Sequence, residues 1–364
     1  MTTPRENILR TLRREGFDDV PVDFYFSPSQ IEAFRKRFGH DDYKAHLGVS
    51  QRDVCGALVP SFGDGHGLFG SETLPPGTKF DEWGIGHSKG SDAAVHMTRM
   101  HHPLKGARSA EEIAAYPYPV VDGSAADRFA KAVAGHHARG FAAIGQMTCT
   151  VWERAWYLRS MEDLMMDMMT EDEKAAVLFD KVTDISCELA ALYARAGVDI
   201  LATGDDIGTQ AGTMISVEMW EGWLKPRLAH VIAAARTVKP DVIVFYHSDG
   251  VVTPFIEGLI EIGVDVLNPI QPECMDFNEI HAAFGERLSF WGTLGTQQLL
   301  PFGSPDQVCE VVRDRIAACG EKGGLVLAPT HMVEPEVPWE NISAIVDTAR
   351  EYSIARYSPG ETDG

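Results

Sequence analysis

The sequence lacks any run of about 18 apolar residues, so no transmembrane helix is expected. Its N-terminus, MTTPRENILRTLRREG, has no apolar core of the kind that signal peptides carry, so we expect no such leader. The six cysteines are scattered and include no C-x-x-C pair, which argues against a zinc ribbon and against a disulfide framework. These absences predict a cytoplasmic protein with reduced thiols.

Positive charge is also scarce. The 364 residues include 32 lysines and arginines against 53 aspartates and glutamates, which gives a formal charge of −21. A surface this acidic repels the phosphates of nucleic acids and anionic lipid headgroups unless its cations cluster, and the sequence shows no such cluster. We therefore expect neither a nucleic acid nor a membrane surface as a partner.

What the sequence does contain is a repeated strand–helix rhythm. Short apolar segments without alternation are each followed by an amphipathic helix: FAAIGQM, VDILATG, VIVFYHS, DVLNPI, LSFWGTLG and GLVLAPTH. This pattern is typical of a parallel sheet covered by helices. Adding PVDFYF (21–26) and one strand near VCGALVP (54–60) gives about eight strands, the number that closes a (β/α)8 barrel. We predict an α/β fold with a single (β/α)8 TIM barrel; a doubly wound sheet is the alternative, but SPSQI is not a glycine-rich phosphate loop.

One barrel is expected to use the whole chain, residues 1–364. The core is predicted at 4–352, followed by a flexible tail at 353–364. Residues 4–14 have the spacing of a short amphipathic helix, which forms an N-terminal extension. Residues 53–108 are rich in glycine and proline and contain short β-like pieces, so they predict a β-rich insertion rather than a second domain.

Polar side chains follow the predicted strands at the ends where a barrel of this kind places its chemistry. Asp205 and Asp206 follow one strand, while His247 and His331 follow two others. We predict these four residues as catalytic. Adjacent aspartates cannot both face the same way, so one is expected to face the pocket and the other to cap a turn.

The two histidines also point to a divalent metal. Imidazole nitrogens with a carboxylate suit zinc, and Asp249 and Glu334 are the candidates for a third ligand. The predicted metal ligands are therefore His247, Asp249, His331 and Glu334, with the Cys274 thiolate as a further option. The alternative is that both histidines act in acid–base catalysis or hydrogen bonding without a metal.

Aromatic residues near the strand ends are candidates for the substrate-binding wall. They are Tyr25, Trp83, Trp152 and Trp291, and Gln210 in a loop between two glycines is added to them. For Trp83 a buried structural role is the alternative. Glu153 and Arg154, which follow a strand end, are candidates for positioning an anionic group, with a surface ion pair as the alternative.

The C-terminal run GLVLAPTHMVEPEVPWENI resembles the last strand–helix unit of the uroporphyrinogen decarboxylase superfamily. Four other segments match that superfamily's layout in the same order: PRENILRTLRREGFDDVPV, FDEWG, GVDVLNPIQPECMD and FWGTLGTQQLLPFGSPDQVCEVVRD. The resemblance covers residues 4–352. It implies a single (β/α)8 barrel with the active site in a deep cleft at the carboxyl ends of the strands, and a homodimer.

The superfamily holds two chemistries. True decarboxylases carry an arginine-rich R-Q-A-G-R-Y segment after the first strand and bind a polyanionic tetrapyrrole, but here that stretch reads DFYFSPSQIEAF, with no arginine before Arg35. The resemblance is therefore closer to the branch of methyltransferases that work with a corrinoid carrier protein. That branch binds zinc through H-x-C and a later cysteine. His247-Ser248-Asp249 and His331 replace both cysteines here, so only nitrogen and oxygen ligands remain at those positions.

These features predict a zinc-dependent methyltransferase. It would move a methyl group from a small substrate, such as a methoxyaromatic compound or an amine, to or from a corrinoid. The corrinoid would be carried by a partner protein, because no D-x-H-x-x-G segment is present in this chain. Two alternatives stay open: a metal-free decarboxylase in which His331 and an aspartate protonate a ring, and a non-catalytic barrel that binds a small ligand.

Overall fold

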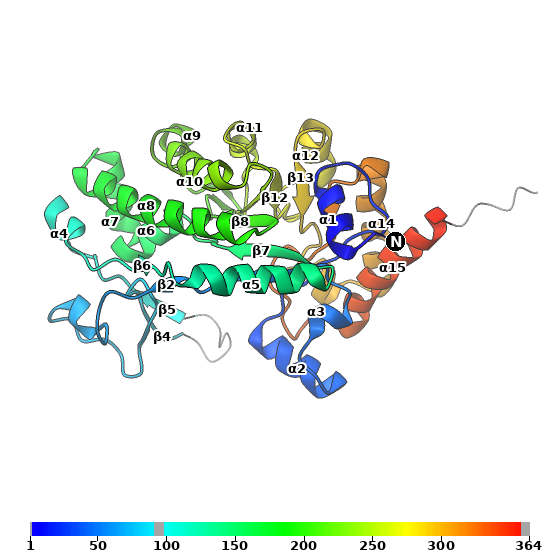
Figure 1. Cartoon of the computed structure of the whole chain (residues 1–364), viewed down its shortest axis with the longest axis horizontal. Helices are drawn as coiled ribbons and strands as arrows, with labels where there is room; N and C mark the ends of the chain where they lie inside the picture. Colours follow the sequence, from blue (N-terminus) through cyan, green and yellow to red (C-terminus); the bar gives the residue numbers. More distant parts are fainter. Residues whose placement is uncertain (1, 91–97, 358–364) are drawn as a thin grey trace, which may run out of the picture.

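The computed structural model describes residues 2–90 and 98–357, and a curled sheet of seven parallel strands lies at its centre (Figure 1). The strands, in their order across the sheet, are β1 (Gln51–Val54), β7 (Ala142–Gln146), β8 (Ile200–Gly204), β11 (Ile243–His247), β12 (Val266–Asn268), β13 (Ser289–Trp291) and β14 (Leu325–Val326). Each strand after β1 follows a helix and pairs in parallel with the strand before it. This confirms the predicted α/β barrel architecture.

The eighth position is filled differently from the prediction. Residues 21–26 form no full strand, but Val22 and Phe26 make isolated parallel bridges with Leu327 and Val333, beside β14. On the opposite side, charged side chains connect this segment to β1. Lys44 of α3 (Tyr43–His46) donates to Asp53 of β1 at 2.6 Å, and the neighbouring carboxylates, Asp23 among them, keep the pKa of Lys44 raised although burial acts to lower it. Side chains therefore complete the ring where backbone pairing ends.

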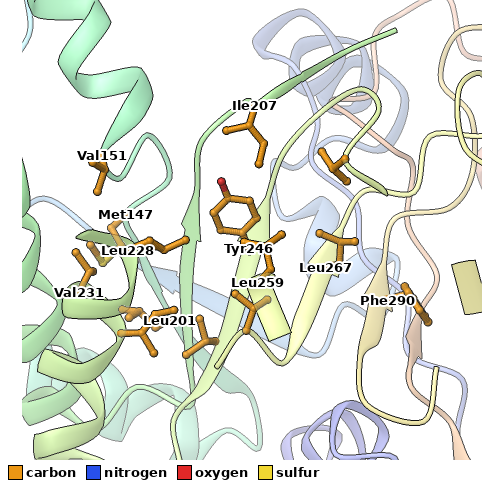
Figure 2. Close-up of a cluster of buried hydrophobic side chains, with 14 of the residues drawn as sticks. Met147, Val151, Leu201, Ile207, Leu228, Val231, Tyr246, Leu259, Leu267 and Phe290 are labelled. Atoms are coloured by element: carbon orange, nitrogen blue, oxygen red, sulfur yellow. The ribbon is translucent and has the colours of Figure 1, made fainter. Parts of the chain in front are cut away.

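Helices pack against the outer face of the sheet. The major ones are α5 (Ala125–Ala138), α8 (Glu173–Ala196), α10 (Lys225–Val238), α11 (Ile256–Glu261), α12 (Phe277–Phe284), α14 (Pro305–Cys319) and α15 (Trp339–Tyr357). Figure 2 shows part of this layer, where Leu201, Tyr246 and Leu267 of three neighbouring strands meet apolar side chains of α10 and α11. None of the described helices is long and apolar enough to cross a membrane.

A second apolar cluster fills the inside of the barrel. Every other strand residue points inward, and these side chains are mostly small or β-branched: Ala142, Ile144, Ile200, Ala202, Ile243, Val266, Val326 and Ala328, with Phe245 and Trp291. The N-terminal helix α1 (Pro4–Leu12) joins the same cluster through Ile8, Leu9 and Leu12. A capping box fixes its start, since Thr3 Oγ accepts from the Glu6 amide and the Glu6 carboxylate accepts from the Thr3 amide at 2.7 Å. The expected N-terminal extension is therefore part of the barrel core.

The remaining elements lie in the connections. The insertion contains β2 (Leu58–Val59), the 3-10 turn His66–Phe69, and the antiparallel strands β3 (Lys79–Phe80), β4 (Gly86–Lys89) and β5 (Thr98–His101). It is attached to the barrel side by a Leu104 amide that donates to Leu158 at 2.9 Å. The β-rich insertion is thus confirmed.

Shorter elements complete the description. They are α2 (Pro28–Phe38), α4 (Ala110–Ala114), β6 (Val120–Val121), α6 (Trp152–Arg159), α7 (Met161–Met169), β9 (Gly208–Thr209), β10 (Gly212–Thr213), α9 (Val217–Met219), a π-helical turn at Trp220–Leu224, α13 (Leu299–Phe302) and two 3-10 turns at Thr253–Phe255 and Gly320–Lys322. At the C-terminus, α15 continues through Tyr357, so the first five residues of the expected tail are helical. Residues 358–364 lie outside the described part of the chain.

Candidate functional site

Strand alternation turns His247 toward the inside of the barrel. It follows Ile243 and Phe245 on the inward face of β11, and Asn268 holds the corresponding place on β12. Gly204 of β8 pairs directly with His247, and a Cβ atom at that position would come within 2.6 Å of the His247 carbonyl oxygen. Glycine therefore lets β8 approach the strand end that carries the histidine.

One nitrogen of His247 is committed to Asn268. The Asn268 amide nitrogen donates to the Trp291 carbonyl at 2.6 Å, which turns its oxygen toward the imidazole. Nδ1–H of His247 then donates to that oxygen, also at 2.6 Å. The other nitrogen, Nε2, is left to face the carboxylates, and Asp206 Oδ1 lies 3.7 Å from it. An outer partner that fixes the tautomer in this way is typical of metal-binding histidines.

Three potential ligands meet at this point. Ligand atoms of Asp206, His247 and Asp249 all lie within 4.8 Å of one another, the one such group of three or more among residues 2–90 and 98–357. The Asp249 amide donates to Asp206 Oδ1 at 2.8 Å, which fixes the two carboxylates relative to each other. Asp249 Oδ1 is buried and has no hydrogen-bond partner. The donor set, one imidazole and two carboxylates, fits a divalent cation.

The other predicted ligands lie around this group. His331 Nε2 is 4.0 Å from Asp249 Oδ2, and its half-exposed ring is centred 6.5 Å from that of His247. Glu334 does not belong to the three-residue group. Cys274 is partly buried with its sulfur 4.0 Å from Gln271 Oε1, and burial raises the pKa of its thiol. The roles predicted for these residues stay predictions.

The adjacent aspartates divide as the sequence suggests. Asp206 faces His247, whereas the buried Asp205 carboxylate accepts from the amides of Val151, at 3.1 and 3.0 Å, and Glu153, at 3.0 Å, where α6 begins. Burial, helped by the Glu153 charge, raises the pKa of Asp205 to about 8. Asp205 therefore acts as an N-terminal cap of α6 and lies outside the group that contains His247.

Glu153 adds a third carboxylate next to the group, and the sequence predicted it only as a candidate for positioning an anionic group. Glu153 Oε2 accepts from the Asp206 amide at 3.3 Å, and Tyr157, one turn later on α6, donates to Glu153 Oε1 at 2.6 Å. Burial and the Asp206 charge raise the pKa of Glu153. The i, i+4 spacing of Glu153 and Tyr157 was readable in the sequence, but the fold that brings β7 beside β8 was needed to place them here.

The predicted substrate wall is not assembled as one surface. Tyr25 is 60% exposed and Gln210 lies exposed in the β9–β10 turn, whereas Trp83, Trp152 and Trp291 are at most 3% exposed. Trp291 lies inside the barrel and donates to Asp23 Oδ2 at 3.1 Å, and Trp152 packs in the outer core. Their predicted contact with a substrate stays a prediction, and among the three only Trp291 donates a hydrogen bond from its indole nitrogen.

Replacing Asn268 by alanine should weaken metal binding by about tenfold to a hundredfold, because nothing then fixes the His247 tautomer. Competition with a chelating dye measures the affinity directly. Gln271→Ala is the matched control: Gln271 is a buried amide that accepts from the Gly250 amide at 2.6 Å but does not contact the imidazole. Equal losses in both variants would contradict a specific role for Asn268.

The family model for uroporphyrinogen decarboxylase (URO-D) matches residues 102–352. The chain belongs to the uroporphyrinogen decarboxylase family. This confirms the resemblance inferred from the C-terminal motifs. It also explains why the barrel carries polar side chains at the carboxyl ends of β8, β11 and β12, the end at which barrel enzymes place their active sites.

Curated relatives in the uroporphyrinogen decarboxylase family are of two kinds. A methylated-thiol–coenzyme M methyltransferase of Methanosarcina mazei is 25% identical over 57% of this chain and 53% of its own length. Methylcobamide:CoM methyltransferase MtaA of Methanosarcina barkeri is 27% identical over 49% of this chain and 50% of its own. A uroporphyrinogen decarboxylase of Coxiella burnetii is 22% identical over 50% and 48%. The chain thus spans about half the length of the curated relatives it matches, and all three are enzymes.

A solved structure supports the fold over almost the whole chain. A methyltransferase from Methanosarcina mazei superposes with a TM-score of 0.68 and 18% identity, covering 97% of this chain and 99% of the other. At this identity the match shows a shared barrel fold.

Proposed function

We propose that this protein is a metal-dependent methyltransferase that works with a corrinoid carried by a separate protein. The Asp206–His247–Asp249 group is the observation that carries the proposal, because its ligand atoms lie close enough together to hold a cation at the end of the barrel where such enzymes place their active sites. The names of the relatives that transfer methyl groups support the type of reaction. The absence of arginine from residues 23–34 argues against a polyanionic tetrapyrrole as substrate.

Electrostatics favour a bound cation. Asp206, Asp249 and Glu153 bring three carboxylates close to one another, and burial and mutual repulsion raise the pKa values of Asp249 and Glu153. Burying several like charges without a compensating ion is strongly unfavourable. A divalent ion would neutralise two of them and would give the orphaned Asp249 Oδ1 a partner. Nitrogen and oxygen ligands without thiolate are compatible with zinc, the ion we propose.

Each side chain then has a definite task. His247 Nε2 and the carboxylates of Asp206 and Asp249 hold the ion, and Asn268 keeps the imidazole in the correct tautomer. The ion, when bound, supplies Lewis-acid polarisation of the substrate heteroatom that carries the methyl group. His331, half-exposed beside Asp249, would hydrogen-bond the same heteroatom as its charge changes. The small substrate is a methoxyaromatic compound or an amine.

Elemental mass spectrometry combined with a methyl-transfer assay tests the proposal. We expect about one zinc ion per chain after purification without chelators, and metal-dependent methyl transfer between cobalamin and methoxyaromatic compounds or methylamines, followed by the visible spectrum of the corrinoid. Decarboxylation of a porphyrinogen by the metal-free protein would instead establish the decarboxylase alternative. Ligand binding without turnover in either assay would establish a non-catalytic barrel.

Metal affinity should increase steadily as the pH is raised from about 5 to about 8. The ion needs deprotonated ligands. Burial opposes protonation of His247, but the carboxylates of Asp249 and Asp206 outweigh it and raise its pKa, while burial raises the pKa of Asp249. Protons therefore compete with the ion at low pH. Calorimetric titration in two buffers of different ionisation enthalpy measures the protons released, and an affinity independent of pH would contradict this ligand set.

A further inference from the structure

Arg154 is an arginine with unused hydrogen-bonding capacity at the boundary between the barrel and the insertion. Its side chain is 18% exposed, its Nε is buried without a hydrogen-bond partner, and its Nη1 reaches Asp81 Oδ2 only at 3.4 Å. The guanidinium lies over the Trp83 ring, 5.1 Å from its centre, and 5.8 Å from the centre of the Tyr157 ring. The two rings fix the direction of the guanidinium fork, whose Nε keeps no hydrogen-bond partner.

The contact with Asp81 neutralises the Arg154 charge only in part. Its Oδ1 accepts from the amides of Trp83 at 3.0 Å and Ile85 at 2.9 Å, and His87 lies 3.6 Å from its Oδ2. One oxygen of the carboxylate is therefore satisfied within its own turn, and the other makes only the longer contacts with Arg154 and His87. A structural ion pair of an arginine with a carboxylate is usually shorter and often bidentate, as the contacts between Arg5 and Asp199 show in this molecule.

Arg154 is also linked to the proposed metal group through its neighbours on α6. It directly follows Glu153 on α6, and Glu153 contacts the Asp206 amide. Tyr157 contacts both neighbours, since its hydroxyl donates to Glu153 and its ring lies under Arg154. Burial and the Glu153 charge raise the pKa of Cys149, which lies between β7 and α6, and the Arg154 charge acts to lower it. Arg154 and the metal group are thus connected through Glu153 and Tyr157.

Resting on the proposed function, we propose that Arg154 binds a carboxylate or sulfonate group of the substrate, so that the substrate is a small organic anion whose methyl-bearing atom lies at the other end of the molecule. A chain of charge −21, with three carboxylates at the metal group, repels any anion unless a fixed cation offsets that field. Arg154 supplies this cation, and its planar fork matches the two oxygens of a carboxylate. Arg154 is thus a specificity-determining residue, and the Trp83 ring of the insertion helps to orient it.

Binding of matched charged and neutral ligands tests this inference on the full chain loaded with zinc. The pairs are methoxybenzoate with methoxybenzyl alcohol, and methoxyacetate with methoxyethanol. Isothermal calorimetry should show tighter binding of the anion in at least one pair. R154Q should weaken that binding by about tenfold to a hundredfold and leave the alcohol unchanged, with partial rescue in R154K. D81N should strengthen anion binding, because it removes a competing carboxylate.

The controls separate this inference from the proposed function. R313Q changes an exposed arginine that pairs with Glu351 at 3.6 Å on the outer helices, and it should alter neither affinity. Equal affinity for anion and alcohol in the unmodified protein, or an R154Q variant that binds the anion normally, overturns the inference. If R154Q does not fold, an unchanged anion affinity in D81N overturns it instead. Zinc content is measured in every variant. If the unmodified protein does not hold zinc but still binds the anion, the result contradicts the proposed function and not this inference.

Discussion

Replacing His247 by alanine should remove metal binding and abolish activity while the barrel stays folded. His247 provides the single imidazole of the Asp206–His247–Asp249 group, so the variant keeps two carboxylates that repel each other and no nitrogen ligand. We expect the affinity for zinc to fall by more than about a hundredfold, since losing a ligand costs more than losing its outer partner. Elemental analysis and chelator competition measure the loss.

The same substitution should cost little stability. The imidazole lies at the end of β11 with 22% of its surface exposed, so its removal leaves mainly the Asn268 oxygen without its donor, at a cost of about 1–2 kcal/mol. His230→Ala, at an exposed position on α10, is the matched control and should keep the metal. Full metal content in the His247 variant would mean that another set of residues holds the ion. Circular dichroism checks that both variants are folded.

Replacing Asp199 by alanine should destabilise the protein by about 3 kcal/mol, at the end of the barrel opposite the metal group. The carboxylate is 3% exposed and receives hydrogen bonds from Arg5 at 2.7 to 3.2 Å, from His137 at 2.8 Å and from the Ala143 amide at 2.9 Å. The bonds from Arg5 link α1 to the start of β8. Breaking a buried pair costs about 3–5 kcal/mol, and we take the lower end because Arg5 is 34% exposed and can be hydrated.

The effect of Asp199 should also depend on pH. Burial opposes its charge, but the bonds from Arg5 and Ala143 outweigh burial and lower its pKa. A carboxylate whose pKa is lower in the folded state stabilises the fold above its unfolded pKa of about 3.9. That contribution is lost as the pH falls through the folded value, so the difference between the variant and the unmodified protein should be full at neutral pH and shrink in acid. Denaturant titrations at several pH values measure it.

Asp241→Ala provides the matched comparison for this experiment. Asp241 lines the same end of the barrel and pairs with Lys239 at 2.7 Å, but its side chain is 67% exposed. Its removal should change stability by less than about 0.5 kcal/mol. Similar losses of unfolding free energy in the two variants would show that the buried contacts of Asp199 stabilise the fold no more than the exposed contact of Asp241. Neither substitution should alter metal affinity, because both positions lie at the amino ends of the strands.

The barrel and its family could be predicted because they depend on local patterns. Apolar strand segments such as VDILATG and VIVFYHS alternate with amphipathic helices, and the terminal motifs resemble one family along the whole chain. Residues 21–26 were predicted as a strand from the same apolar pattern, yet they make only isolated bridges. Whether a segment pairs on both edges depends on its neighbours, and here Lys44 enters from α3 on the side that faces β1.

The candidate site was predictable only as a set of strand-end residues. The sequence places His247, Asp206 and Asp249 after neighbouring strands, and parallel pairing then brings them to one rim. It could not choose between Asp205 and Asp206, because the choice depends on where the amides of Val151 and Glu153 lie in space. It also could not show that Trp83, Trp152 and Trp291 are buried, since burial cannot be read from residue type alone.

The sequence by itself determined the α/β barrel, the family and the strand ends at which polar side chains gather, because periodicity and strand order are properties of the chain. Only the tertiary structure decided that Asn268 holds the His247 tautomer, that Glu153 adds a third carboxylate and that Arg154 keeps an Nε without a hydrogen-bond partner. The reason is physical: hydrogen bonds and charge repulsion act over a few ångströms between residues that the sequence separates by 21 positions or more.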